Sequence, residues 1–249
     1  MPRIVLRVGL LVSGLTGFWW AATALPIFLS ASPVHDIISR IVADERLRPD
    51  LLSEMLVHIE GTSTSLVAES SVSRAKALIR LELAEKAIRR PDGMDDGDRQ
   101  VLDAERDLKF SLGQNPNDSF QWMLLYSVVM TRNGFDPVNI KYLVESYQMG
   151  PREGWIALRR NQLALGGFPF LDDALRRAVI AEFAQIVDAD FSGEAALILK
   201  GVGWVYREEL LLALEKADLV SRENLYRRLA ADGLKLKIPD IAYDERPWR

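Results

Sequence analysis

Residues 104–125, AERDLKFSLGQNPNDSFQWMLL, contain two amphipathic segments separated by a turn. Leu108 and Leu112 are four residues apart, a spacing that places both on one face of a helix. Pro116 ends that helix because proline lacks an amide hydrogen and clashes with the preceding turn. A second apolar face starts at Trp122. The stretch therefore predicts two helices joined by a short turn.

The same turn recurs further along the chain. Pro151 follows Pro116 by 35 residues, and Trp155 follows Trp122 by 33. Gly134 interrupts the apolar pattern between the two tryptophans, as expected where one helix ends and the next begins. Two restarts at nearly the same interval indicate an internal repeat of helical hairpins.

This repeat resembles the tetratricopeptide repeat. In that family the second helix follows A-x3-[LF]-x2-[AS]-L-x3-P, and the first helix of the next repeat carries W-x2-L. The resemblance covers roughly residues 74–165. Tyr126 and Arg159 stand where the family usually has glycine, so the helices must cross at a different angle. The matching residues are Ala104, Leu108, Ser111, Leu112, Pro116, Trp122 and Leu125, and again Leu143, Ser146, Tyr147, Pro151, Trp155 and Leu158.

The resemblance implies an all-α fold, with a short tetratricopeptide-like α-solenoid of helical hairpins. Past about residue 165 the spacing drifts, and helices are expected at 172–188, 193–200, 206–217 and 221–232 without the signature. The predicted organisation is an anchor at 1–32, an amphipathic neck at 33–65, hairpins at 66–165, degenerate hairpins at 166–234 and an extended tail at 235–249.

The anchor is expected to be a transmembrane helix at residues 8–29. These twenty-two residues contain no ionisable side chain. At about 1.5 Å per residue, a helix of this length reaches about 33 Å, enough to cross a hydrocarbon core of about 30 Å. A cleaved secretory signal is the alternative, because small residues at 30–32 resemble a cleavage site. The length of the run and Trp19-Trp20 favour a permanent span.

The charges around this segment predict its orientation. Arg3 and Arg7 precede it, whereas the arginines that follow it are diluted by acidic residues. The positive-inside rule then leaves the N-terminus in the cytoplasm and the C-terminal domain in the periplasm, on a single-pass inner-membrane protein. Ser13, Gly17 and Ala21 recur every four residues and could pack against a second span, which would permit self-association through the anchor.

Composition excludes several classes of function. The chain has no cysteine, so it can form neither a disulfide nor a thiolate metal site. Beyond the two arginines of the anchor, 29 basic residues face 35 acidic ones, a net charge of −6. Proteins that bind nucleic acid gain most of their affinity from basic side chains on phosphates, so no nucleic-acid partner is expected.

Among metal sites, the sequence partly matches the pattern of a calcium-binding loop. From Asp92 onward the acidic spacing approaches that of the calcium-binding hand, but Met94 takes the third position and Asp103 the twelfth. Methionine offers no oxygen, and Asp103 is shorter than the usual bidentate glutamate. The aspartates in the expected loop at 92–98 are better explained as helix caps. No metal and no cofactor is predicted.

Enzymatic activity is not predicted either. His35 and His58 are the only histidines, and their spacing fits neither a metal pair nor an acid–base pair. Glu69-Ser70 is similar to the catalytic glutamate segment of lytic transglycosylases, but the accompanying Gly-Leu-Met-Gln is absent. The nucleophile-elbow, phosphate-loop, dinucleotide and zinc-protease motifs are also absent. No catalytic residue is assigned.

The family resemblance does suggest a binding surface. Stacked hairpins leave a concave face lined by the first helix of each pair. The resemblance places Met123, Ser127, Met130 and Ile156 on that face, and Arg159, Arg160 and Asn161 could clamp a carboxylate. The alternative is that the paired arginines are ordinary solvated helix surface.

These patterns favour a membrane-anchored periplasmic scaffold or adaptor that binds a partner protein through its helical-repeat groove. The chain also resembles accessory proteins of alphaproteobacterial surface-polysaccharide assembly, which implies an envelope complex. A glycan-binding or glycan-processing protein of such a pathway is the alternative. Two convergent carboxylates about 5 to 10 Å apart in a deep cleft would favour hydrolysis. A shallow open groove would favour the adaptor.

Overall fold

The computed structural model describes residues 13–21, 48–61, 66–88, 94–151 and 153–242. Every regular element within these ranges is helical, so the prediction of an all-α fold is confirmed for them. The chain divides into two compact units, Met1–Pro116 and Asn117–Arg249. The division falls within the turn formed by Pro116 and Asn117, inside the segment expected to carry the hairpins.

Most of the expected anchor lies outside the described residues. Within 8–29 only residues 13–21 are described, as a helix with exposed side chains that carries Ser13, Gly17 and Ala21. None of the helices in the described ranges is both long and apolar enough to cross a bilayer.

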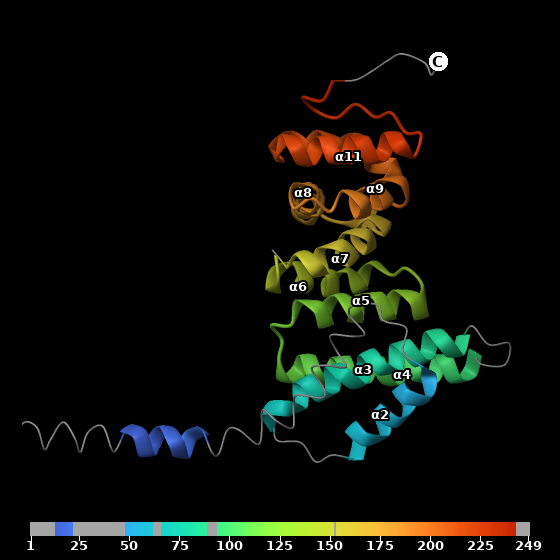
Figure 1. Cartoon of the computed structure of the whole chain (residues 1–249). Coiled ribbons are helices and arrows are strands. Elements are labelled where there is room, and N and C mark those ends of the chain that lie inside the picture. Colours follow the sequence, from blue (N-terminus) through green and yellow to red (C-terminus); the bar gives the residue numbers. More distant parts are fainter. Residues whose placement is uncertain (1–12, 22–47, 62–65, 89–93, 152, 243–249) are drawn as a thin grey trace, which may run out of the picture. The chain divides into compact units, whose positions relative to one another are not determined.

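The first unit contains three described helices beyond the anchor region: α2 (Pro49–Gly61), α3 (Leu66–Ile88) and α4 (Met94–Gln114). Figure 1 shows α3 and α4 side by side, with α2 against α3. Leu52 and Ile59 of α2 are buried against Ala75 and Ile79 of α3. The apolar face of the neck therefore packs onto the first long helix.

Helix α4 begins earlier than the sequence predicts. The expected loop at 92–98 is wrong from Met94 onward, because Met94 to Asp98 are helical. Asp95 and Asp96 lie in the first turn, where a negative charge complements the helix dipole. A calcium-binding loop of twelve residues cannot form from a segment that is already helical at its third position.

A single arginine joins the three helices of this unit. The Arg80 guanidinium lies 2.6 Å from Glu60 of α2 and 2.9 Å from Asp103 of α4. Its Nε is also 2.9 Å from Asp107 Oδ2, in poor hydrogen-bonding geometry. Burial raises the pKa of the Asp107 carboxyl above its ordinary 3.8, although Arg80 and Lys76 act in the opposite direction.

The second unit is one continuous helical body. The prediction of separate helices after residue 165 is confirmed. The helix expected at 206–217 is α-helical in its first part and a 3-10 helix from Ala213 to Lys216. Its elements are α5 (Ser119–Asn133), η1 (Pro137–Asn139), α6 (Ile140–Met149), α7 (Gly154–Gly166), η2 (Phe168–Phe170), α8 (Asp173–Asp188), α9 (Ser192–Lys200), η3 (Trp204–Tyr206), α10 (Arg207–Leu212), η4 (Ala213–Lys216) and α11 (Leu219–Ala231).

Short polar side chains define where these helices start and stop. Asp118 accepts a hydrogen bond from the Gln121 amide before α5, and Asp172 accepts one from the Leu175 amide before α8. Such caps satisfy amides that the helix itself leaves unpaired. Gly134 ends α5 with φ of 75°, a conformation that favours glycine.

The core of this unit crosses the boundary expected at residue 165. Tyr126 and Leu143 belong to the same buried cluster as Val179 and Leu225. Ile238 also belongs to this cluster, so the non-helical segment after α11 lies against the helices. In Figure 1, α8 is seen end-on whereas α11 runs across the view, so α8 crosses it steeply. That crossing differs from a regular stack of antiparallel hairpins.

The raised pKa of Asp107 predicts a pH dependence of stability. Between pH 3.8 and the raised value, the folded chain holds this proton more tightly than the unfolded chain, so the free energy of unfolding falls as pH rises. Asp107→Asn removes this loss. We therefore expect the free energy of unfolding of the variant, minus that of the original chain, to increase as the pH rises just above 3.8. Urea unfolding of both chains at several pH values measures this difference. The exposed Asp98→Asn on the same helix is the control, and a parallel profile for both variants would contradict the prediction.

Candidate functional site

The most elaborate polar cluster of the second unit is buried and centres on Arg160 of α7. The Arg160 side chain is fully buried. Its Nη2 lies 2.5 Å from Glu182 Oε1 of α8, and its Nε donates to the same oxygen at 3.0 Å. Two charge-assisted hydrogen bonds from one guanidinium to one carboxylate are among the strongest contacts between side chains.

The remaining donors of Arg160 reach the C-terminal end of α6. Nη1 donates to the Ser146 carbonyl at 2.6 Å, and Nη2 donates to the Gly150 carbonyl at 3.0 Å. The last carbonyls of a helix lack intrahelical partners, and a cation is favourable there. Ser119 of α5 also joins, because its hydroxyl donates to the Ser146 carbonyl at 2.9 Å. Arg160 thus connects α5, α6, α7 and α8.

The second oxygen of Glu182 is also occupied. The Tyr147 hydroxyl donates to Glu182 Oε2 at 2.6 Å, and the Tyr147 ring lies 4.1 Å from the Arg160 guanidinium carbon. Asn161 donates from Nδ2 to the Val179 carbonyl at 2.8 Å. Burial raises the pKa of Glu182, with Arg160 opposing it, and burial next to Glu182 raises the pKa of Tyr147 well above its ordinary value.

Close packing keeps this network closed to a ligand. A Cβ atom added to Gly150 would lie 2.5 Å from the Ser119 hydroxyl oxygen, so only glycine fits at this crossing. Glu182 is 3% exposed and Ser146 is fully buried. The guanidinium and the carboxylate satisfy each other, and no face of the pair is presented to solvent. We therefore assign the network to the interior of the fold rather than to a binding site.

An accessible hollow lies between α5 and α7. It measures about 640 Å³, is open to solvent and is mainly apolar. We call it the α5–α7 groove and define it by its lining residues: Met123, Leu124, Tyr126, Ser127, Met130, Phe135, Arg159, Gln162, Leu163, Gly166, Gly167 and Val202.

Four of the seven residues proposed from the sequence for partner binding line this groove, Met123, Ser127, Met130 and Arg159, although Met123 is itself buried at 1% exposure. The other three, Ile156, Arg160 and Asn161, are fully buried, which leaves them no surface for a partner. Arg160 and Asn161 do meet a carboxylate, as the sequence suggested, but it is Glu182 of the chain itself. The interior position follows from helical geometry, because Arg160 and Asn161 share a face with Ala157 and Ala164 rather than with Arg159.

The groove has one cationic edge. Arg159 is exposed, and within the described ranges it has no ion-pair partner. No aspartate or glutamate is found among the described lining residues. A guanidinium that is free to bind a carboxylate therefore stands beside a neutral apolar surface.

Sequence reasoning missed an aromatic pair, of which one member, Phe135, lines the groove. The rings of Phe135 and Phe170 lie 4.3 Å apart, and these residues are 39% and 57% exposed. Gly167 permits this arrangement, because a Cβ there would lie 3.2 Å from the Phe135 ring and 3.1 Å from the Tyr126 hydroxyl. Phe135 follows the end of α5 and Phe170 is the last residue of the three-residue η2, so no helical periodicity marks either of them. The available signal was the pair of glycines at 166–167.

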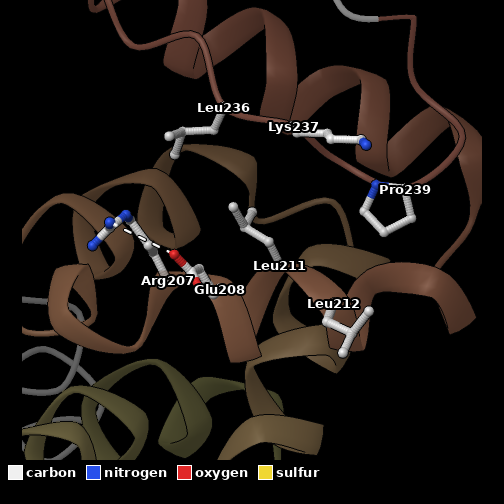
Figure 2. Close-up of a pocket in the computed structure, with 7 residues that line it drawn as sticks. All are labelled: Arg207, Glu208, Leu211, Leu212, Leu236, Lys237 and Pro239. Atoms are coloured by element: carbon white, nitrogen blue, oxygen red, sulfur yellow. Dashed lines mark ion pairs between the residues drawn. The ribbon is translucent and has the colours of Figure 1, made fainter.

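Two smaller hollows lie elsewhere in the second unit. Figure 2 shows one of about 390 Å³, where Leu236, Lys237 and Pro239 of the C-terminal segment lie over Leu211 of α10. The other, of about 460 Å³, lies between α8 and η4. Neither contains any of the residues proposed from the sequence. The part of the chain that the structure describes contains no cluster of three His, Cys, Asp or Glu side chains placed to hold a metal ion.

Comparisons with protein-family models, with characterised proteins and with solved structures find no match to this chain. The groove and the buried network are thus interpreted from their own geometry.

The buried pair makes a prediction about stability. Arg160→Met or Glu182→Met leaves an uncompensated charge inside the second unit, and each should lower the free energy of unfolding by about 3–5 kcal/mol. The double variant removes both charges and should lose clearly less than the sum of the two single effects. Urea unfolding of the full chain tests this. The exposed Arg159→Met is the control and should stay within about 0.5 kcal/mol of the original chain. Additive losses in the double variant would contradict the assignment.

Proposed function

We propose that the chain is a membrane-anchored helical scaffold that binds a partner protein in the α5–α7 groove. The observation that carries this proposal is the groove itself: an open, mainly apolar hollow whose arginine has no ion-pair partner among the described residues. Apolar surface provides affinity, and a few polar groups provide orientation, which is the usual composition of a recognition site. The residues nominated from the repeat pattern supply three of its lining side chains, and the proposed carboxylate clamp supplies a fourth, Arg159.

The lining also argues against glycan hydrolysis. Such a reaction needs two carboxyl groups on either side of the scissile bond. The described residues of the groove include none, and Glu182, the buried carboxylate of α8, is committed to Arg160 and Tyr147. An open groove without acidic residues in its described lining favours the adaptor over the glycan-processing alternative.

The location that we propose is the periplasmic side of the inner membrane, with residues 8–29 as the span. Its support is the sequence: twenty-two residues without an ionisable group, preceded by Arg3 and Arg7. A scaffold held beside the membrane would bring its partner to a membrane complex, in keeping with the resemblance to envelope polysaccharide accessory proteins.

A photo-crosslinking amino acid tests the groove. Placed at Gln162, an exposed lining residue, it should form an adduct with a second protein in native membranes, identified by mass spectrometry. The same amino acid at Glu223, an exposed position of α11 outside the groove, is the control and should give no such adduct. Equal yields at both positions, or polysaccharide alone at Gln162, would count against the proposal.

Reporter fusions test the location. Alkaline phosphatase fused after Arg249 should be active, because that enzyme needs the oxidising periplasm. Green fluorescent protein fused at the same position should not fluoresce, because it does not fold when it is exported unfolded. Replacing Arg3 and Arg7 by glutamate removes the positive charge before the span and should lower phosphatase activity. A fluorescent fusion of the original chain would refute the proposed orientation.

A further inference from the structure

We infer that the α5–α7 groove takes one amphipathic helix of the partner, and that an acidic residue of this helix pairs with Arg159. The inference rests on the proposed function and specifies the partner's chemistry. Two helices supply the walls. Met123, Ser127 and Met130 are spaced by four and three residues along α5. Residues at this spacing form one row on a helix surface.

The facing row on α7 has the same length. Arg159, Gln162 and Gly166 are spaced by three and four residues. Seven helical residues extend about 10 Å, or about two turns. The α5–α7 groove between two such rows is suited to a third helix. The side chains of that helix at positions i, i+3 or i+4, and i+7 would lie in the groove.

The lining of the groove suits apolar side chains. Met130 and Leu163 are half-buried and supply apolar surface to the groove, whereas Met123 is 1% exposed and lies beneath them. Methionine has three rotatable bonds and a polarisable sulfur, so it adapts to side chains of different shape. Phe135 adds an exposed ring at one end. A partner helix with leucine, methionine or phenylalanine on one face fits these surfaces.

Gly166 leaves the end of the groove empty. It is exposed, and a Cβ built on it would meet no atom within 4 Å. The fold itself therefore does not require glycine at this position. A helix lying along the groove does gain from it, because the missing side chain lets the partner's backbone approach α7 closely.

Arg159 selects the charge of the partner. It is exposed, lines the groove and has no ion-pair partner within the described ranges. A guanidinium can donate two hydrogen bonds to one carboxylate, which fixes orientation as well as charge. A basic residue at the same place would meet like charge without compensation. The partner helix should therefore carry aspartate or glutamate beside its apolar face.

The test uses the full-length chain with the photo-crosslinker at Gln162, in native membranes. Gly166→Phe fills the groove, and Arg159→Glu reverses its charge. Each should lower the adduct yield about tenfold or more. The matched controls are Gly193→Phe, where an added Cβ also meets no atom within 4 Å, and Arg177→Glu on the exposed side of α8. Both should remain within about twofold of the original yield. Circular dichroism melting of each purified variant checks that it folds.

The sequenced adducts complete the test. Crosslinked peptides with helical apolar spacing and an acidic residue support the inference, as does partial retention of the adduct in Arg159→Lys. Wild-type yields in Gly166→Phe or Arg159→Glu, or peptides without an acidic residue, overturn the inference but leave the proposed function standing. A Gln162 crosslinker that captures no protein, or captures only glycan, overturns both.

Discussion

The second unit depends on one ion pair. Arg160 and Glu182 bring a charge from α7 and a charge from α8 into the buried interior, where further hydrogen bonds surround both of them. Isolated, either charge would be expensive to bury. Together they order four helices, since Arg160 also holds the carbonyl end of α6 and reaches Ser119 of α5. The positions of α5 and α7, and hence the groove between them, follow from this arrangement.

Most helix limits could be predicted from local chemistry. Gly134 ends α5 where the sequence predicted a break, and Asp118 and Asp172 cap helices that the apolar spacing had located. The start of α4 was missed because Asp95 and Asp96 were expected to precede the helix as caps, whereas they lie in its first turn, where the helix dipole stabilises a negative charge equally well. Errors of this kind arise where one residue type serves two local structures.

The lining of the α5–α7 groove was predicted in part. The family resemblance placed Met123, Ser127 and Met130 on one face of α5, and all three line the groove, but adjacent residues of α7 were assigned a common role. Arg159 and Arg160 are about 100° apart around a helix, so one faces the groove and the other the interior. Glu182, the carboxylate that pairs with Arg160, lies 22 residues further along the sequence. No local pattern identifies such a pairing, because it depends on how α7 and α8 cross.

The position of Ile238 determines when the core of the second unit can be completed during synthesis. The core that begins with Tyr126 also includes Ile238, near the end of the described chain. During synthesis, Arg160 and Glu182 leave the ribosome well before that isoleucine, so helices can dock around the ion pair while part of their apolar surface is still uncovered. Until residue 238 is available, the apolar side chains that Ile238 covers remain exposed in the growing chain.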